Sequence, residues 1–251
     1  MYYFIFCFIS IFYYIPNAIA EDLVVGTTSG YAPYVSLNAE GEYEGFDIDI
    51  AKALADKMGR KLVIKDFGSM PALILAIKQN KADVLIWAIS ITHDRQKQMA
   101  MVYYQGEKVT SLPLLFWGEI PDNIKCLEDM ANNPKNVISV EAGSFQENVL
   151  LGIPGLTIKQ VDKVSDAILE LKYRKSQATL IYNSIKKIYM KKFPQLKSLT
   201  ITLPELKQSM GNGICLNSNN TELIAAVQKV VDGLLTDGTI ADLEAKWKLE
   251  E

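Results

Sequence analysis

The 251-residue chain lacks features that define several classes of protein. It has 26 Lys and Arg residues against 29 Asp and Glu, a net charge of -3, so the positive excess expected of a nucleic-acid-binding protein is missing. Its single histidine, His93, excludes a histidine-rich metal site, and no glycine-rich loop is present that could hold a phosphate chain. We therefore expect no metal, no cofactor and no nucleic-acid partner, and composition favours a small-molecule ligand.

Cysteine is also scarce, with Cys126 and Cys215 the only two after residue 20. A disulfide between them is one interpretation. Two separate thiols are favoured, because a chain of this length can bury a core without a cross-link. A nucleophilic cysteine pair with histidine would require His93 to meet one of them, whereas its pattern is that of a solvent-facing helix residue. Enzyme chemistry therefore has little support, and we expect a protein that is not an enzyme.

Residues 1–20 contain no charged side chain and eight of the 24 aromatic residues. The apolar run at 4–12 is too short to span a bilayer, and the Ala-Ile-Ala sequence at 18–20 fits a signal-peptidase site. We expect 1–20 to be a signal peptide and the remainder to be periplasmic. The alternative is an uncleaved anchor, because the leader has no basic residue. No later apolar run reaches transmembrane length.

From residue 22 onward, strand-like and helix-like segments alternate, which predicts an α/β protein with parallel strands. The expected strands are 23–26, 62–64, 83–87, 112–117, 137–140, 156–158, 178–181 and 213–216, with a hairpin turn at 38–41. The expected helices are 47–58, 72–78, 92–101, 127–131, 146–151, 164–173, 184–193, 222–235 and a last one that begins at a Thr239 cap and ends near Trp247.

Six stretches, in order, resemble the family 3 solute-binding proteins, the periplasmic receptors of polar amino-acid ABC importers. They are VGTTSGYAP at 25–33, GEYEGFDIDIA at 41–51, ALILAIK at 72–78, ISITHDR at 89–95, AGSFQ at 142–146 and LLTDGTIADLEAKW at 234–247. Within the family, ALIL at 72–75 and KKFPQLKSLTITLPE at 191–205 are similar to the arginine-binding branch known from chlamydial bacteria.

The resemblance implies a two-lobe periplasmic binding protein (type II) fold in which the chain crosses between the lobes at two hinges. Lobe 1 would contain 21–111 and 205–251, and lobe 2 would contain 112–204. Ligand would bind in the cleft between them, outside the carboxyl ends of the strands.

Arg95 is the leading candidate for binding a ligand carboxylate. It follows Thr92 by three residues at a helix start, where a guanidinium fork and free backbone N–H groups would converge. In family register it matches the residue that binds the ligand carboxylate; the plainer interpretation is an exposed arginine. Ser90 and a turn from the other lobe, with Ser144, Phe145 and Gln146, would add donors, although a Gly-Ser turn can be a simple helix cap.

The expected aromatic wall differs from the family pattern. Tyr31 would supply one face of the pocket. Met70 stands where many members place a stacking aromatic residue, and Trp87 where many place a small one. The adjacent Ala88 is also expected to contact the ligand. The resemblance thus implies a reshaped pocket, with a core role for Trp87 as the alternative.

The acidic anchors are the main departure. Tyr182 replaces the acid that pairs with the ligand's α-amino group, and Thr28 replaces an acid that in several members meets a cationic side chain. A phenol cannot neutralise an ammonium group. Glu141, at the end of its strand, could compensate; the alternative is an ordinary exposed glutamate.

These residues lead to three hypotheses. The first is a monomeric receptor that closes on a basic amino acid such as arginine, or a related cation, and docks on an inner-membrane ABC permease. The second is an enzyme similar to cyclohexadienyl dehydratases, with Glu141 as its acid. The third is a ligand sensor that works without a transporter.

Overall fold

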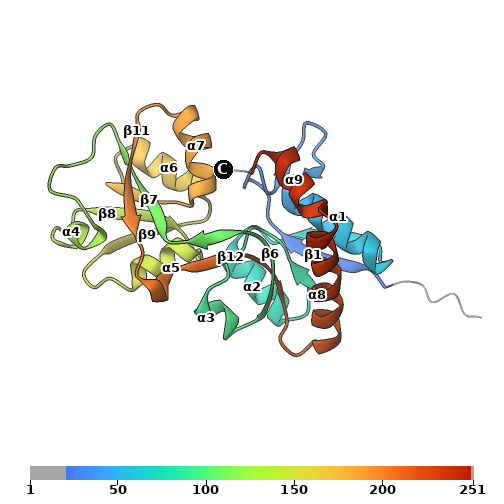
Figure 1. Ribbon diagram of the computed structural model, residues 1–251. Coiled ribbons are helices and arrows are strands. Elements are labelled where there is room, and N and C mark those ends of the chain that lie inside the picture. The colour runs from blue at the N-terminus through green and yellow to red at the C-terminus, as the bar shows by residue number, and fades with distance from the viewer. Residues whose placement is uncertain (1–20, 250–251) are drawn as a thin grey trace, which may run out of the picture.

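The computed structural model describes residues 21–249, so the expected signal peptide lies outside the described residues. Two lobes, each built on a five-stranded sheet, are joined by two extended connections (Figure 1). This is the expected two-lobe α/β fold.

Lobe 1 contains a mixed sheet of order β4-β1-β5-β12-β6. Strand β1 is parallel to β4 and β5, whereas β12 is antiparallel to β5 and β6. The strands are β1 (Leu23–Thr27), β4 (Leu62–Asp66), β5 (Val84–Leu85), β6 (Ala100–Val109) and β12 (Ser209–Leu216), with a small hairpin of β2 (Ser36–Leu37) and β3 (Tyr43–Glu44). The helices are α1 (Phe46–Met58), α2 (Met70–Lys78), α3 (His93–Gln96), α8 (Thr221–Thr236) and α9 (Thr239–Trp247).

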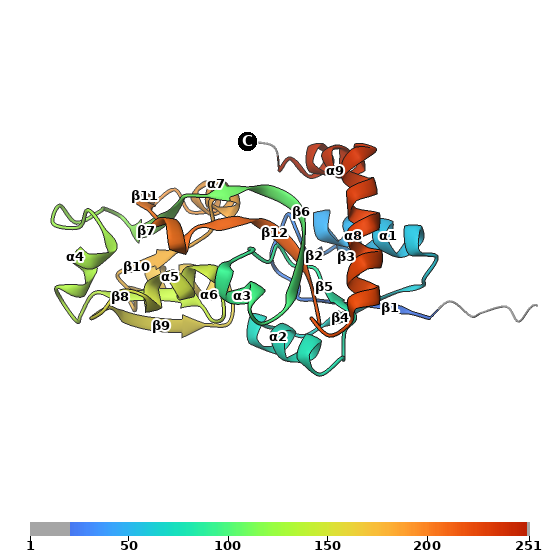
Figure 2. The same cartoon turned by 60° about the horizontal axis from the view of Figure 1, so that its bottom comes forward.

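Amphipathic spacing explains how these helices cover the sheet. In α8, Leu223, Val227, Val231 and Leu234 are buried on one face, as the four-residue and three-residue spacing predicts. Helix α1 ends at Gly59, whose φ of 63° is the left-handed conformation that glycine adopts without steric cost. Helices α1, α8 and α9 pack together, and α2 lies apart from them beside β1 and β5 (Figure 2).

Lobe 2 contains a sheet of order β11-β7-β10-β8-β9, with β8 parallel to β9 and β10 and with β7 antiparallel to β10 and β11. The strands are β7 (Ser111–Trp117), β8 (Val137–Glu141), β9 (Thr157–Val161), β10 (Ala178–Leu180) and β11 (Leu196–Thr202). The helices are α4 (Leu127–Ala131), α5 (Phe145–Leu151), α6 (Val164–Lys172) and α7 (Asn183–Lys192), and a 3-10 turn η1 (Glu205–Lys207) lies on the return to lobe 1. Two apolar clusters form its core, one with α4 and α5 and one with α6 and α7.

The chain changes sheets between β6 and β7, at residue 110, and between β11 and β12, across 203–208. The two crossings are bonded to each other, because the Leu203 N–H donates to the Thr110 carbonyl at 2.8 Å. The expected lobe boundaries at 111/112 and 204/205 lie beside these crossings. Their role as hinges stays a prediction.

Three local predictions were wrong or incomplete. The helix expected over 92–101 ends after one turn, and Ala100 begins the long strand β6, where Val102 and Tyr104 are buried on either side of exposed Tyr103. Aromatic and β-branched residues favour this pleated, half-buried surface, and pairing with β12 outweighs local helix preference. Strand β11 was not predicted. Thr239 is the first residue of α9 and not its cap; the Asp237 carboxylate accepts bonds from its N–H and hydroxyl.

His93 is exposed on α3, as predicted. Cys126 and Cys215 are free thiols, the second fully buried. Within 21–249 no helix is both long enough and apolar enough to cross a membrane.

Candidate ligand-binding site

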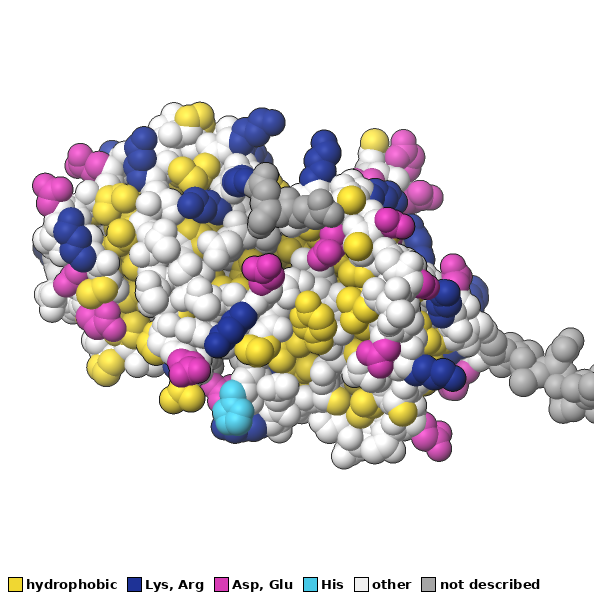
Figure 3. Space-filling view, viewed as in Figure 1, with side chains coloured by type: hydrophobic (Ala, Val, Ile, Leu, Met, Phe, Trp, Pro, Cys, Tyr) yellow, Lys and Arg dark blue, Asp and Glu magenta, His cyan; other side chains and the backbone are white. Residues whose placement is uncertain are grey.

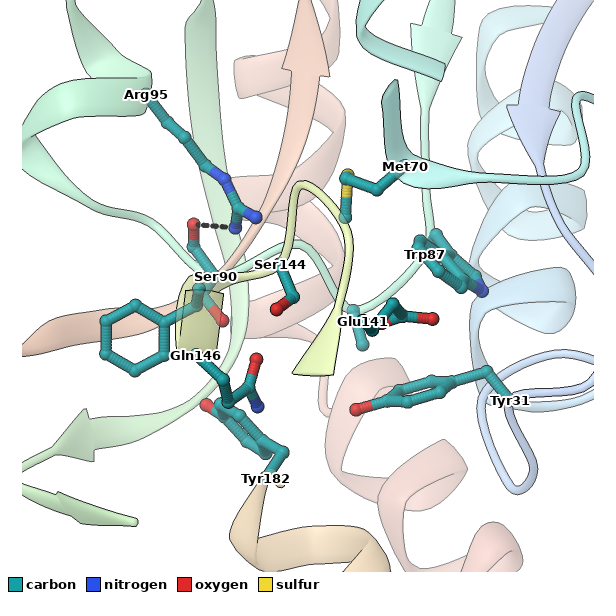
Figure 4. Close-up of a pocket in the computed structure, with 11 residues that line it drawn as sticks. Tyr31, Met70, Trp87, Ser90, Arg95, Glu141, Ser144, Gln146 and Tyr182 are labelled. Atoms are coloured by element: carbon teal, nitrogen blue, oxygen red, sulfur yellow. Dashed lines mark hydrogen bonds between the residues drawn. The ribbon is translucent and has the colours of Figure 1, made fainter. Parts of the chain in front are cut away.

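A cavity between the lobes brings together eleven of the twelve side chains expected to bind ligand (Figure 4). Its volume is about 300 Å³, counting the part open to solvent. The lining residues are Tyr31, Met70, Trp87, Ala88, Ser90 and Arg95 from lobe 1 and Glu141, Ser144, Phe145, Gln146 and Tyr182 from lobe 2. Thr28 follows β1 and is buried, but it does not line this cavity, so its contact with ligand stays a prediction.

Arg95 is held at the start of α3, and among residues 21–249 its guanidinium group is bonded only to carbonyl oxygens. The Thr92 hydroxyl accepts the Arg95 N–H at 3.3 Å, which starts the helix as the sequence predicted. One guanidinium nitrogen donates to the Ser90 carbonyl at 2.9 Å, and the other to the Gly143 carbonyl at 3.0 Å. Burial lowers the pKa of Arg95 from its usual value. The side chain is 8% exposed and has no carboxylate partner among residues 21–249, so its charge is uncompensated by an ion pair.

Glu141 is the second uncompensated ionisable group of the cavity. It is the last residue of β8, 8% exposed, and its carboxyl group has no hydrogen-bond partner among the described residues. Burial raises its pKa from 4.5 to about 8, although Arg95 and Lys163 act in the opposite direction. The expectation of an ordinary exposed glutamate is therefore excluded. A cationic group entering the cavity would restore the charged form of Glu141.

Tyr182, the residue expected at the position of the family's acid, lies just after β10 and lines the cavity. Burial raises its pKa to about 12, so it remains a neutral phenol at physiological pH. It can exchange hydrogen bonds with a ligand but supplies no negative charge.

The aromatic part of the wall comes from lobe 1. The rings of Tyr31 and Trp87 lie 5.5 Å apart between centroids, and both residues line the same cavity as Glu141. The Trp87 indole N–H is buried without a hydrogen-bond partner in the described part of the chain, and Met70, at the start of α2, is also buried. Two aromatic faces beside a carboxyl group are a suitable environment for a flat cation.

The polar groups at the start of α5 already have hydrogen-bond partners within the protein. The Ser144 hydroxyl caps the helix by accepting the Glu147 N–H at 3.1 Å. The Glu147 carboxylate accepts the Gly143 N–H at 2.7 Å and also bonds to Gln160. The Gly143 amide is therefore not free to bind a ligand anion, and Arg95 is the one cationic residue in the cavity lining.

The sequence did not indicate that Asp47 supports the lobe 1 loop of the site, which carries Trp87 and Ser90. Asp47 is completely buried; its carboxylate accepts the Ala88 N–H at 2.6 Å and the Tyr104 hydroxyl at 2.7 Å. Ala88 has a φ of 43°, an uncommon conformation for a residue with a side chain, between Trp87 and Ser90. Asp47 thus holds the loop that carries these two residues. The Asp in GFDIDIA was visible in the sequence, but nothing in the pattern showed that this acid is buried.

The two lobes contact each other around the cavity. Besides the Arg95 bond to Gly143, the Asn148 amide donates to Asp94 at 3.4 Å and the Lys163 ammonium group to the Ser29 carbonyl at 3.3 Å. The cleft is therefore closed in this structure. Outside it, basic and acidic side chains are mixed over both lobes on the face in Figure 3. No cluster of metal-ligating side chains occurs in the described chain.

Comparison with known proteins gives the same architecture. The profile of the bacterial extracellular solute-binding proteins, family 3, matches residues 23–250. A curated relative, the probable ABC transporter arginine-binding protein ArtJ of Chlamydia trachomatis serovar D, is 33% identical over 92% of this chain and 87% of its own.

Two solved structures are also similar. An ancestral arginine-binding protein bound to arginine is 28% identical, with a TM-score of 0.78 over 91% of this chain and 99% of that one. An ancestral amino acid-binding protein, described as a precursor of cyclohexadienyl dehydratase, is 25% identical, with a TM-score of 0.75 over 90% of this chain and 94% of that one.

Proposed function

The chain belongs to the bacterial extracellular solute-binding proteins of family 3, and on that premise we propose that it is the receptor of an amino-acid ABC importer, with a basic amino acid, arginine first, as its ligand. The observation that carries the choice of ligand is the pair of uncompensated groups in one cavity, the Arg95 guanidinium group and the buried Glu141 carboxyl group. A zwitterion with a cationic side chain supplies a partner for each.

We assign the ligand carboxylate to Arg95. Its guanidinium group has five N–H donors, and the two carbonyl bonds leave donors free for a carboxylate. Such a charge-assisted bond in a buried site is stronger than a neutral one.

Glu141 receives the ligand's positive charge. Tyr31 and Trp87 line the same cavity, so a guanidinium group could lie on one of their rings while it bonds to the carboxylate. This arrangement would compensate for the acid missing at Thr28, which in several members meets the ligand's cationic side chain, whereas the ligand's α-ammonium group would face the neutral Tyr182. The names of the arginine-binding relatives support the same ligand.

Closure would couple binding to transport. Ligand that touches Arg95 in lobe 1 and Glu141 in lobe 2 favours the closed state by its differential affinity. The closed protein would then dock, as a monomer, on an inner-membrane ABC permease from the periplasmic side.

Calorimetric titration with arginine, agmatine and citrulline tests this assignment, because agmatine lacks the carboxylate and citrulline lacks the cation. Arginine should bind at least tenfold more tightly than either analogue, a difference of about 1.4 kcal/mol or more. In Glu141→Gln the preference for arginine over citrulline should disappear, and in the matched control Glu40→Gln, an exposed loop glutamate, it should remain. Equal binding of arginine and citrulline by the unaltered protein would refute the role of Glu141.

A second candidate function rests on the same carboxyl group. With a pKa of about 8, Glu141 is mostly protonated at neutral pH and could act as a general acid in a dehydratase, as the similarity to the cyclohexadienyl dehydratase precursor suggests. Turnover of prephenate or arogenate that is lost in Glu141→Gln would favour it. No turnover, together with arginine binding, supports the receptor.

A further inference from the structure

A second cavity lies in lobe 2, away from the ligand cleft. It has a volume of about 490 Å³, counting space open to solvent, and is lined by residues where β7 ends and where β8 and β10 begin. Glu141 and Tyr182 lie at the other ends of β8 and β10. At about 3.3 Å per residue, the five-residue strand β8 separates the two cavities by roughly 16 Å, so they are separate sites.

Positive charge is concentrated in this cavity. Lys135, Arg174 and Lys175 line it, against Glu119 as its one acidic wall residue. None of the three cations has a carboxylate within ion-pair distance among residues 21–249. The wall thus carries a charge of 3 - 1 = +2 in a chain whose net charge is -3.

One of the residues that line the cavity carries a buried hydroxyl group without a partner in the described part of the chain. Ser176 is 7% exposed, and its Oγ atom has no hydrogen-bond partner in the described structure. Such groups are uncommon in folded proteins because desolvating them without a bond costs free energy. Arg174, Lys175 and Ser176 are consecutive in the turn between α6 and β10, so the turn fixes their relative positions. The cavity wall therefore combines three exposed cations with one buried residue, Ser176, whose hydroxyl group could form a hydrogen bond.

We propose that this cavity is a second binding site, for a small phosphate-bearing anion. A phosphate monoester carries nearly two negative charges and three strong acceptor oxygens, which match the +2 wall and its donors better than a single carboxylate does. Trp117 also lines the cavity and offers an apolar face for the organic part of such a ligand.

Inorganic phosphate and phenyl phosphate are the probes, titrated into the mature chain by calorimetry at constant ionic strength. Both should bind saturably, with a dissociation constant of about 1 mM or lower, and phenyl phosphate more tightly because its ring can lie on Trp117. Arg174→Gln should weaken binding at least tenfold, in line with the loss of a charge-assisted bond, and Ser176→Ala at least about threefold.

Matched controls are Lys197→Gln and Ser198→Ala. Lys197 is an exposed cation of β11, and Ser198 has a buried, unpartnered hydroxyl outside the cavity. Both variants should bind as the parent does, and melting temperatures verify that all four variants fold. Arg95→Ala must also retain phosphate binding, because its loss would assign the anion to the ligand cleft.

The proposal is overturned if neither probe binds saturably up to about 20 mM, a concentration at which any specific site would be detected. It is equally overturned if Arg174→Gln and Lys197→Gln bind alike. Neither result depends on whether arginine binds in the cleft, so the outcome is independent of the proposed function.

Discussion

Arginine binding should release a proton from Glu141, and its affinity should therefore depend on pH. In the ligand-free protein, burial raises the pKa of Glu141 to about 8, with Arg95 and Lys163 lowering it and Asp166 raising it further. At pH 7 about one molecule in ten carries the charged form. Providing that form costs about 1.4 kcal/mol at pH 7 and about 2.7 kcal/mol at pH 6.

The affinity for arginine should accordingly rise about ninefold from pH 6 to 7 and about fivefold from pH 7 to 8, and level off above. Calorimetry in buffers of different ionisation enthalpy measures the accompanying proton release, which should be about 0.9 per arginine at pH 7. Glu141→Gln should bind weakly, release no proton and show no such slope. Because that variant retains Asp47, the second buried acid, the difference isolates Glu141.

The contribution of Glu141 to the free energy of unfolding changes with pH in the opposite direction to the arginine affinity. The pKa of Glu141 is raised from 4.5 to about 8, so the ligand-free fold binds this proton more tightly than the unfolded chain. Its contribution to stability is fully present below about pH 4.5 and is lost as pH rises through about 8.

An arginine affinity that is flat from pH 6 to 8, or proton uptake on binding, would refute the reasoning about Glu141.

Three further predictions concern neighbouring groups. Arg95→Ala should weaken arginine binding by about 2–4 kcal/mol in calorimetric titration, and a loss below about 0.7 kcal/mol would remove Arg95 from the site. Gly143→Ala places a Cβ 3.1 Å from Met70 across the cleft, so it should weaken binding by about 1–2 kcal/mol and abolish the arginine-induced decrease in radius of gyration in small-angle scattering. Gly118→Ala carries the same positive-φ strain with no neighbour within 4 Å and should close normally; identical behaviour of the two variants would contradict the steric argument. Tyr104→Phe leaves the buried Asp47 carboxylate without one donor and should lower the free energy of unfolding by about 1–3 kcal/mol in urea, against less than about 0.5 kcal/mol for the exposed control Tyr103→Phe; equal losses would show that the Asp47 bond contributes little.

Local sequence signals predicted the elements that carry the site. The GFDIDIA stretch begins α1, the apolar face of α8 follows helical spacing, and Thr92 caps α3 at the residue expected. Each depends on residues three or four positions apart, which interact within one helix whatever the rest of the chain does. Eleven of the twelve residues that the family resemblance implies for the site line one cavity.

The sequence predicted the strands that lead into the lobe crossings, β6 and β11, less well than it predicted the helices. The sequence pattern predicts a helix over the first two residues of β6 and no element over the rest of β6 or over β11, because both strands are stabilised by partners far along the chain, β12 and β7. Strand preference depends strongly on such packing, so a local pattern carries little of it.

The burial, hydrogen-bond partners and pKa values of the site residues could not be predicted from the sequence. The chain itself determined that Arg95 and Glu141 are present, that Tyr182 stands where an acid was expected, and that each follows a strand or begins a helix. Only the tertiary structure decided that Glu141 is buried and unpaired, that Arg95 meets the carbonyl of Gly143, and that Asp47 supports Ala88. The physical reason is that a pKa and a hydrogen-bond partner depend on which distant segments exclude water from a group, and that exclusion arises only when the two lobes fold and close.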